Sequence, residues 1–131
     1  MWDWVLGICG INKMKESYVI RVVKDYLQIQ RNQKKLVYIR NNSGAMPIID
    51  GENKRRYIKF GDKGSPDFLI WMPGIINNPD FPAILRAIAI ECKSDIGRQS
   101  EDQIEWQKDF EAIGGEYYIV KSIEDLVKII L

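Results

Sequence analysis

The chain has 131 residues, of which 46% are hydrophobic and 28% charged, and its formal net charge is +1. This length and balance are typical of one globular domain with a buried core. The sequence contains no histidine, which excludes histidine acid–base catalysis, Ser-His and Cys-His nucleophile pairs, and metal sites built on imidazole.

The cysteines and the apolar runs bear on the cellular compartment. Cys9 and Cys92 are too few for a disulfide framework, which favours a reducing compartment such as the cytoplasm. No apolar run reaches the length of a transmembrane helix. Met1 to Ile11 lack a basic leader and a cleavage site. Met14 is a plausible internal start, so we expect residues 1–13 to be an N-terminal extension followed by one domain over residues 14–131.

The charge is unevenly distributed along the chain. Residues 31–63 carry nine basic and three acidic side chains, whereas residues 94–125 carry three basic and nine acidic ones. The basic part of such a dipolar chain can meet phosphates. Taken alone, a solvated surface is the commoner explanation of such a run.

The first predicted element is an amphipathic helix from Glu16 to Gln30, in which apolar residues recur close to the 3.6-residue period. Glu16 projects from roughly the same face as these apolar residues. A carboxylate in the first turn is favoured by the helix dipole, which is its structural explanation. The functional alternative is a carboxylate aimed into a site, and the residues alone leave both open.

A short strand over Leu36 to Arg40 comes next, ended by the turn formers Asn41-Asn42-Ser43-Gly44. The stretch from Met46 to Asp62 is expected to be irregular, with a turn at Asp50-Gly51. Its basic side chains are interleaved with aromatic ones, a pattern that suits a groove along a nucleic-acid backbone or a mobile solvated loop. We favour nucleic-acid contacts by its basic side chains, which are Lys54, Arg55, Arg56 and Lys59, and by Lys63, which directly follows it.

Two apolar strands are predicted at the centre of the fold. A glycine and proline turn from Gly61 to Pro66 holds Asp67 at the start of the first strand, Phe68 to Met72, because proline fixes the backbone there. The second strand runs through Ile88 to Lys93. Two apolar strands joined by one connecting loop are most simply an antiparallel pair.

The second strand carries an acid and a base two positions apart. Side chains alternate across a strand, so Glu91 and Lys93 share one face while Ile90 and Cys92 share the other. Lone charges are costly in so apolar a strand unless they are paired. They are either a structural ion pair at a strand end or a metal-ligand carboxylate beside a catalytic lysine.

The remaining elements complete the order helix, three strands, helix, strand, helix. Ser100 to Gln103 matches a capping box that opens a helix, and Gly114-Gly115 stops it. A strand at Tyr117 to Val120 and a final helix from Ser122 follow. This order predicts an α/β fold in which a mixed sheet is flanked by helices.

Asp67 and the segment Glu91-Cys92-Lys93 can bring two carboxylates and one ammonium together from neighbouring strands. Hard oxygen ligands bind Mg²⁺ or Mn²⁺. A lysine nearby can orient a water molecule or stabilise developing negative charge. Phosphodiester hydrolysis needs this kind of set.

The ordered motifs resemble the virus-type replication-repair nuclease (VRR-NUC) branch of the PD-(D/E)xK nuclease superfamily. Pro66-Asp67 followed by Glu91-Cys92-Lys93 is weak as a bare pattern, but the wider set is more specific and covers about residues 14–131. That set adds Glu16, Arg40-Asn41-Asn42, Gly64-Ser65, Gln99-Ser100, Gln103, Trp106 and Gly114 to Val120.

The resemblance implies a restriction-endonuclease-like αβββαβα core and a DNA nuclease that depends on Mg²⁺ or Mn²⁺. Asp67, Glu91 and the main-chain carbonyl of Cys92 would bind the metal ion. Glu16 would add a further carboxylate, Lys93 would position the attacking water, and Gln103 would approach the site from its helix, so the expected catalytic residues are Asp67, Glu91, Lys93, Gln103 and Glu16.

The resemblance also implies a homodimer that acts on branched DNA such as a four-way junction, in the cytoplasm of a bacterial or phage-infected cell. We expect three further DNA contacts outside the basic stretch, at Arg40, Asn42 and Arg98. The 23 residues between Asp67 and Glu91 exceed the short hairpin that we associate with the family. The added loop from Ile75 to Phe81 could shape substrate or dimer contacts.

Two other classes of function stay open from the residues. One is a DNA-binding module that keeps the fold without the chemistry. The other is a protein-interaction domain whose basic stretch is merely solvated.

Overall fold

The computed structural model describes residues 15–74, 79–80 and 84–130. The expected N-terminal extension, residues 1–13, and most of the Ile75 to Phe81 loop lie outside the described residues. The elements in chain order are α2 (Glu16–Asn32), β1 (Val37–Arg40), β2 (Gly44–Ile49), β3 (Arg55–Phe60), β4 (Phe68–Pro73), β5 (Leu85–Cys92), α3 (Glu101–Ala112), β6 (Glu116–Val120) and α4 (Ile123–Ile130).

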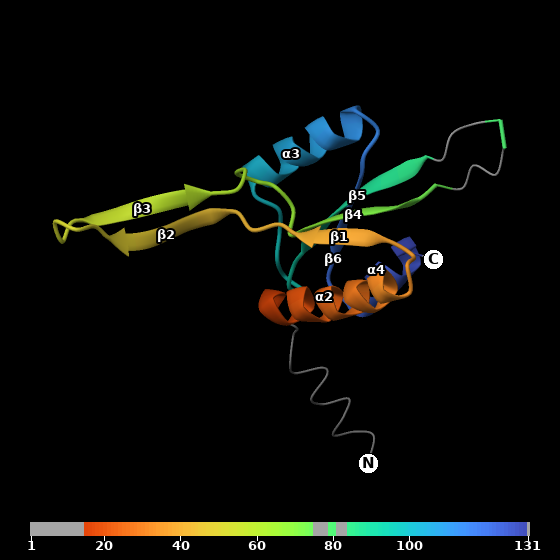
Figure 1. Ribbon diagram of the computed structural model, residues 1–131, viewed down its shortest axis with the longest axis horizontal. Helices are drawn as coiled ribbons and strands as arrows, with labels where there is room; N and C mark the ends of the chain where they lie inside the picture. The colour runs from red at the N-terminus through yellow and green to blue at the C-terminus, as the bar shows by residue number, and fades with distance from the viewer. Residues whose placement is uncertain (1–14, 75–78, 81–83, 131) are drawn as a thin grey trace, which may run out of the picture.

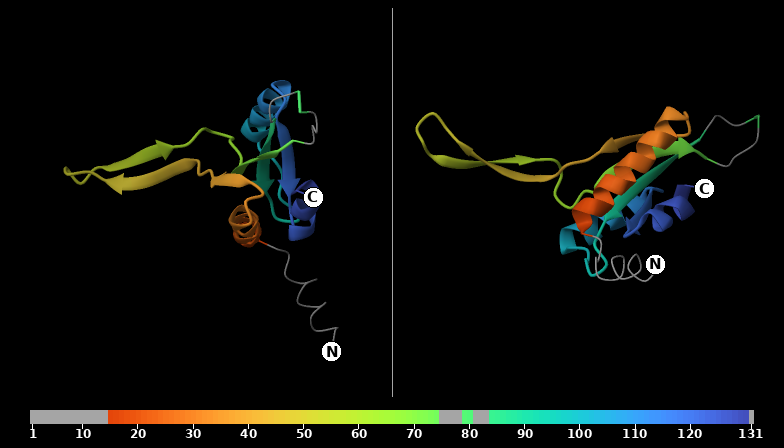
Figure 2. Two further views of the ribbon diagram at one scale, coloured as in Figure 1. Left: turned by 45° about the vertical axis from the view of Figure 1, so that its right-hand side comes forward. Right: turned by 90° about the horizontal axis from the view of Figure 1, so that it is seen from below.

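Four strands form a mixed sheet in the order β1-β4-β5-β6 (Figure 1). The pairs β1–β4 and β4–β5 are antiparallel, and the pair β5–β6 is parallel. Helices α2 and α4 lie on one side of the sheet and α3 on the other (Figures 1 and 2). The predicted α/β fold is therefore confirmed, and the αβββαβα order is kept with β2 and β3 inserted after β1.

The core lies between the sheet and helix α2, which buries a stripe of residues four positions apart, Val19, Val23 and Leu27. Phe68 and Ile70 of β4 are fully buried against this side and alternate with partly exposed residues. Burying one such side chain contributes about 1.5–3 kcal/mol, so this packing fixes the positions of the strand ends. None of the described helices is long and apolar enough to cross a membrane.

The register of β4 and β5 brings two predicted site residues together. Phe68 lies opposite Ile90 in an antiparallel pair. The residue before Phe68 must then lie beside the residue after Ile90, because the two strands run in opposite directions. Asp67 and Glu91 therefore meet at one end of the sheet.

The expectation of an irregular stretch from Met46 to Asp62 is wrong, because this stretch contains most of β2 and all of β3. The two strands pair from Gly44 opposite Phe60 to Ile49 opposite Arg55, as a separate two-stranded sheet. The Asp50 side chain closes the turn by accepting the N–H groups of residues 52 and 54. This β2–β3 hairpin projects away from the main sheet (Figures 1 and 2).

Candidate metal centre

Three carboxylates converge at the end of the sheet where β4 begins and β5 ends. Glu16, Asp67 and Glu91 each offer an oxygen, and these oxygens all lie within 4.8 Å of one another. Glu16 opens α2, Asp67 precedes β4 and Glu91 lies near the end of β5. The structure thus brings together carboxylates that are 75 positions apart in the chain.

The turn before Asp67 is tied to the end of β1. Asn41 N–H donates to the main-chain oxygen of Asp67 at 2.8 Å. The Asn41 side-chain amide donates to Ser65 Oγ at 2.8 Å and to the Pro66 carbonyl at 2.9 Å. Asn41 was interpreted only as a turn former within a motif, and this positioning role was missed.

The same turn is also fitted against α3. Gly64 has a φ of +81°, and a Cβ atom at this position would lie 2.4 Å from the main-chain oxygen of Asp102. Only glycine adopts this conformation without strain and allows so close an approach. The turn that carries Asp67 is therefore held between β1 and the first turn of α3.

The Asp67 carboxylate is oriented by two partners. Its Oδ2 accepts the Cys92 N–H at 2.7 Å, and its Oδ1 lies 3.5 Å from Arg40 Nη1. Arg40 also donates to the main-chain oxygens of Asp67 and Asn41, and its guanidinium lies over the Phe68 ring. Through these contacts Arg40 positions Asp67, and its contact with nucleic acid stays a prediction.

Glu91 is buried beside a lysine. Its side chain is 3% exposed, and its Oε1 lies 3.6 Å from Nζ of Lys93, whose side chain is 10% exposed. Burial and the nearby charge of Asp67 raise the pKa of Glu91 to about 8, although the Lys93 ammonium opposes this shift. Glu91 Oε2 is buried and has no hydrogen-bond partner among the described residues.

Gln103 combines the two roles that the sequence suggested for it. Its N–H donates to Ser100 Oγ at 3.2 Å and its Oε1 accepts the Ser100 N–H at 2.9 Å, so the predicted capping box is present. Its Nε2 donates to Glu91 Oε1 at 3.1 Å. The box thereby aims the amide at the carboxylate cluster.

Cys92 lies between Glu91 and Lys93, and its main chain borders the cluster through the hydrogen bond to Asp67. Its carbonyl stays a predicted metal ligand. Burial strongly raises the pKa of the Cys92 thiol, which favours its neutral form.

The residues present fit a hard divalent cation. All of the side-chain donors are oxygens, which suits Mg²⁺ and Mn²⁺. Oxygens on opposite sides of an octahedral Mg²⁺ ion are about 4.2 Å apart. This is close to the 4.8 Å within which the oxygens of Glu16, Asp67 and Glu91 lie. Glu91 Oε2 is a buried oxygen without a hydrogen-bond partner in the part of the chain that the structure describes, as expected of a ligand atom.

The predicted nucleic-acid contacts other than Arg40 lie on the surface. Two of them form ion pairs, Arg56 with Asp50 at 2.8 Å and Lys63 with Asp102 at 3.2 Å. The others are exposed and have no ion pair within the described part of the chain: Asn42, Lys54, Arg55, Lys59 and Arg98.

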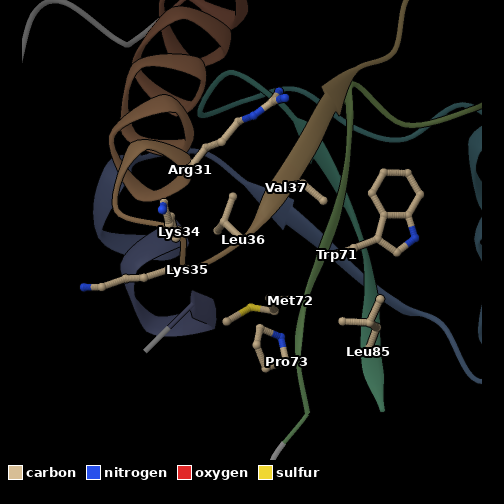
Figure 3. Close-up of a pocket in the computed structure, with 9 residues that line it drawn as sticks. All are labelled: Arg31, Lys34, Lys35, Leu36, Val37, Trp71, Met72, Pro73 and Leu85. Carbon is tan, nitrogen blue, oxygen red and sulfur yellow. The ribbon is translucent and has the colours of Figure 1, made fainter. Parts of the chain in front are cut away.

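A shallow pocket lies at the opposite end of β4, away from the carboxylates (Figure 3). Leu36, Val37 and Met72 contribute apolar lining, Arg31 comes from the last turn of α2, and Lys34 from the turn that follows it. Since Asp67 precedes β4 and the pocket borders the end of that strand, this pocket is separate from the carboxylate cluster.

The fold and the site together define an α/β domain with a mixed sheet and an acidic cluster at one sheet end. No protein-family model, curated protein or solved structure matches the chain. The inference about function therefore depends on the geometry of the site.

Proposed function

We propose that the chain is a metal-dependent nuclease that hydrolyses phosphodiester bonds in DNA. The observation that carries this proposal is the convergence of three carboxylates, Glu16, Asp67 and Glu91, with the ammonium of Lys93 beside them. Asp67 is held by the main-chain N–H of Cys92, and Glu91, on the buried strand β5, is held by the side-chain amide of Gln103. Such preorganisation is what electrostatic catalysis requires.

In this proposal Asp67 and Glu91 hold Mg²⁺ or Mn²⁺, and Glu16 adds its carboxylate from the edge of the site. The bound ion supplies positive charge against the phosphate and lowers the pKa of bound water. Ionised carboxylates are needed for this role, so the raised pKa of Glu91 means that binding an ion displaces a proton from the cluster.

Lys93 would act on the water and the phosphate. Its Nζ is held 3.6 Å from Glu91 Oε1 in a buried environment, where a charge interacts more strongly than in water. The ammonium can donate a hydrogen bond to the attacking water or to a phosphate oxygen. The net reaction adds water across one phosphodiester bond and yields a phosphate monoester and a hydroxyl group.

The exposed basic side chains support DNA as the polymer. Lys54, Arg55 and Lys59 lie on the hairpin that extends from the end of the sheet near Asp67, so they can contact phosphates beyond the cleavage point. The resemblance to VRR-NUC proteins supports a homodimer that resolves branched DNA. The homodimer and the branched DNA substrate are parts of the proposal.

The test is metal-dependent cleavage by the wild type and by Lys93→Ala. We expect the variant to bind DNA normally but to cleave roughly 100- to 1,000-fold more slowly, because one preorganised donor is lost. The measurement is the rate of nicking of supercoiled plasmid with Mg²⁺, Mn²⁺ or chelator, extended to junction, flap, duplex and single-stranded DNA. Lys108→Ala is the matched control, because Lys108 is exposed on α3 and lies outside the cluster.

Undiminished cleavage by Lys93→Ala would overturn this mechanism. DNA binding without metal-dependent nicking by the wild type would instead indicate a catalytically silent DNA-binding module. An absence of salt-sensitive DNA affinity would indicate a protein-interaction domain.

A further inference from the structure

One side of the β2–β3 hairpin combines cations with an exposed aromatic ring. Residues directly opposite one another in an antiparallel pair point to the same side of the sheet. Arg55, Tyr57 and Lys59 of β3 lie on one side, and their partners in β2, which are Ile49, Pro47 and Ala45, lie there with them. We call these six side chains the basic–aromatic face.

The polar and aromatic groups of this face have no partners within the described part of the chain. The Tyr57 side chain is 67% exposed, and its ring contacts neither another ring nor a cation there. The paired strands contain three cations, of which Arg56, on the opposite side, is paired with Asp50 at 2.8 Å. The two cations without a counter-ion among the described residues, Arg55 and Lys59, both belong to the basic–aromatic face.

The charge of this face selects an anionic partner. The paired strands contain no acidic residue, so nothing on them opposes the approach of an anion. An anion alone would leave the Tyr57 ring and the apolar side chain of Ile49 in water. The partner that fits the whole face therefore combines negative charge with an exposed flat apolar surface.

Single-stranded nucleic acid has both properties. Its phosphates pair with lysine and arginine, and its unpaired bases stack on aromatic side chains. In a duplex the faces of the bases are covered by their neighbours, so a protein meets only the backbone and the base edges. A duplex would thus use Arg55 and Lys59 but not the Tyr57 ring.

The face leads away from the carboxylate cluster. Lys59 lies near the end of β3, and the turn that follows this strand holds Asp67. The two ends of the hairpin are in close contact beside that turn, because a Cβ atom on Gly61 would overlap the main-chain oxygen of Asn42. From there Lys59, Tyr57 and Arg55 follow one another outward at intervals of about 7 Å, roughly the length of one extended nucleotide (Figure 1).

We propose that the basic–aromatic face binds a single strand of DNA, with a base stacked on the Tyr57 ring and the neighbouring phosphates paired with Arg55 and Lys59. The strand follows β3 away from the carboxylate cluster. The inference rests on the proposed function only in making this strand the part of the substrate next to the cut.

The test is the affinity for a short labelled oligothymidine, measured by fluorescence anisotropy in the presence of a chelator. An abasic oligonucleotide of the same length has the same phosphates but no bases. We expect the wild type to bind oligothymidine roughly 10-fold more tightly than the abasic strand, because stacking of one base contributes about this factor. Tyr57→Ala should lose this preference and bind both strands equally.

Two control variants separate stacking from a change of fold. Tyr57→Phe keeps the ring and should keep the preference for bases. Ile58→Ala alters the next residue of the same strand, which points to the opposite side, and it should bind both strands like the wild type. Circular dichroism should show the same fold for all variants.

The cations should act on both strands alike. Arg55→Ala and Lys59→Ala should each weaken binding of oligothymidine and of the abasic strand by the same factor. Each should also lower the slope of log affinity against log salt concentration by about 0.7, because one phosphate contact is lost.

Three outcomes would overturn the inference. The first is equal binding of both strands by the wild type, and the second is a Tyr57→Ala protein that still prefers bases. The third is displacement of oligothymidine by polyglutamate as readily as by unlabelled oligothymidine, which would indicate a site for an acidic protein.

The two proposals fail separately, because the chelator makes the binding assay independent of cleavage. Glu91→Gln should abolish cleavage and keep the preference for bases. Base-dependent binding without nicking by the wild type overturns only the proposed function. Metal-dependent nicking by a protein that binds both strands equally overturns only the present inference.

Discussion

Glu91 combines deep burial with an acidic neighbour and a basic one. Its side chain is 3% exposed, the charge of Asp67 disfavours ionisation and the ammonium of Lys93 favours it. Burial outweighs the ion pair, because removing a carboxylate from water costs more than one cation restores. The metal-free protein therefore keeps a proton on the cluster at neutral pH.

This protonation predicts that the metal-free protein loses stability as the pH rises from about 4.5 to about 8. In that window Glu91 is ionised in the unfolded chain and protonated in the folded one, so the folded state binds more protons and the free energy of unfolding falls with pH. The expected loss is of the order of a few kcal/mol. Urea unfolding at a series of pH values in the presence of a chelator measures it.

Glu91→Gln is the control for this pH dependence, because it keeps the size of the side chain and removes its titration. Its free energy of unfolding should change much less over the same window. A wild-type stability that rises between these pH values would contradict the assignment.

Glu91 and Lys93 could be singled out from sequence because they interrupt a strongly apolar segment, where a charge requires an explanation. Asp67 was singled out by the glycine and proline turn before β4, whereas the residues alone left the role of Glu16 open. The positioning roles of Arg40 and Asn41 could not be predicted in this way. Their partners include main-chain oxygens more than 20 positions away, and such contacts leave no mark in local composition.

At the scale of elements, the turn from Gly61 to Pro66 connects the hairpin to the site. We expect Gly64→Ala to lower the free energy of unfolding by about 2 kcal/mol or more, because alanine is strained at a φ of +81° and its Cβ would overlap the Asp102 main chain. Urea denaturation measures this loss. Gly51→Ala is the control: Gly51 has open space around it and should lose less than about 0.5 kcal/mol.

Equal stabilities of the two variants would show that the close contact between Gly64 and α3 is not made in solution. A loss confined to Gly64→Ala would support the fit of this turn between β1 and α3.

The helices and the four strands of the main sheet could be predicted because each buries one face, and that burial produces a regular apolar period. Helix α3 buries an apolar face only in part, since none of its residues is fully buried and the nearby Ile113 is 84% exposed. The hairpin strands were missed because β2 and β3 are exposed along almost all of their length. The turn signal at Asp50-Gly51, followed by the β-forming Tyr57 and Ile58, could have indicated them.

At the scale of the whole molecule, the carboxylates of the site come from parts of the chain that only the complete fold brings together. An ion bound to the folded state alone stabilises it. We predict that Mg²⁺ or Mn²⁺ at about 100 times its dissociation constant raises the free energy of unfolding by about 2.7 kcal/mol. Thermal unfolding with and without the ion measures this as a higher Tm.

Asp67→Asn should abolish most of this shift in Tm, because it removes a ligand that only the folded chain presents. Asp109→Asn, an exposed position on α3, should retain it. The same shift in both variants would place the ion elsewhere on the molecule.

Gln103 cannot freely turn its amide over, because its Oε1 is occupied by the Ser100 N–H. Its NH₂ group consequently donates to Glu91 Oε1, while Glu91 Oε2 has no hydrogen-bond partner among the described residues. A carboxylate that binds Mg²⁺ through one oxygen leaves more of the six coordination positions of the ion to water and phosphate. In the proposed ion site, the first turn of α3 therefore favours binding by Glu91 through a single oxygen, Oε2.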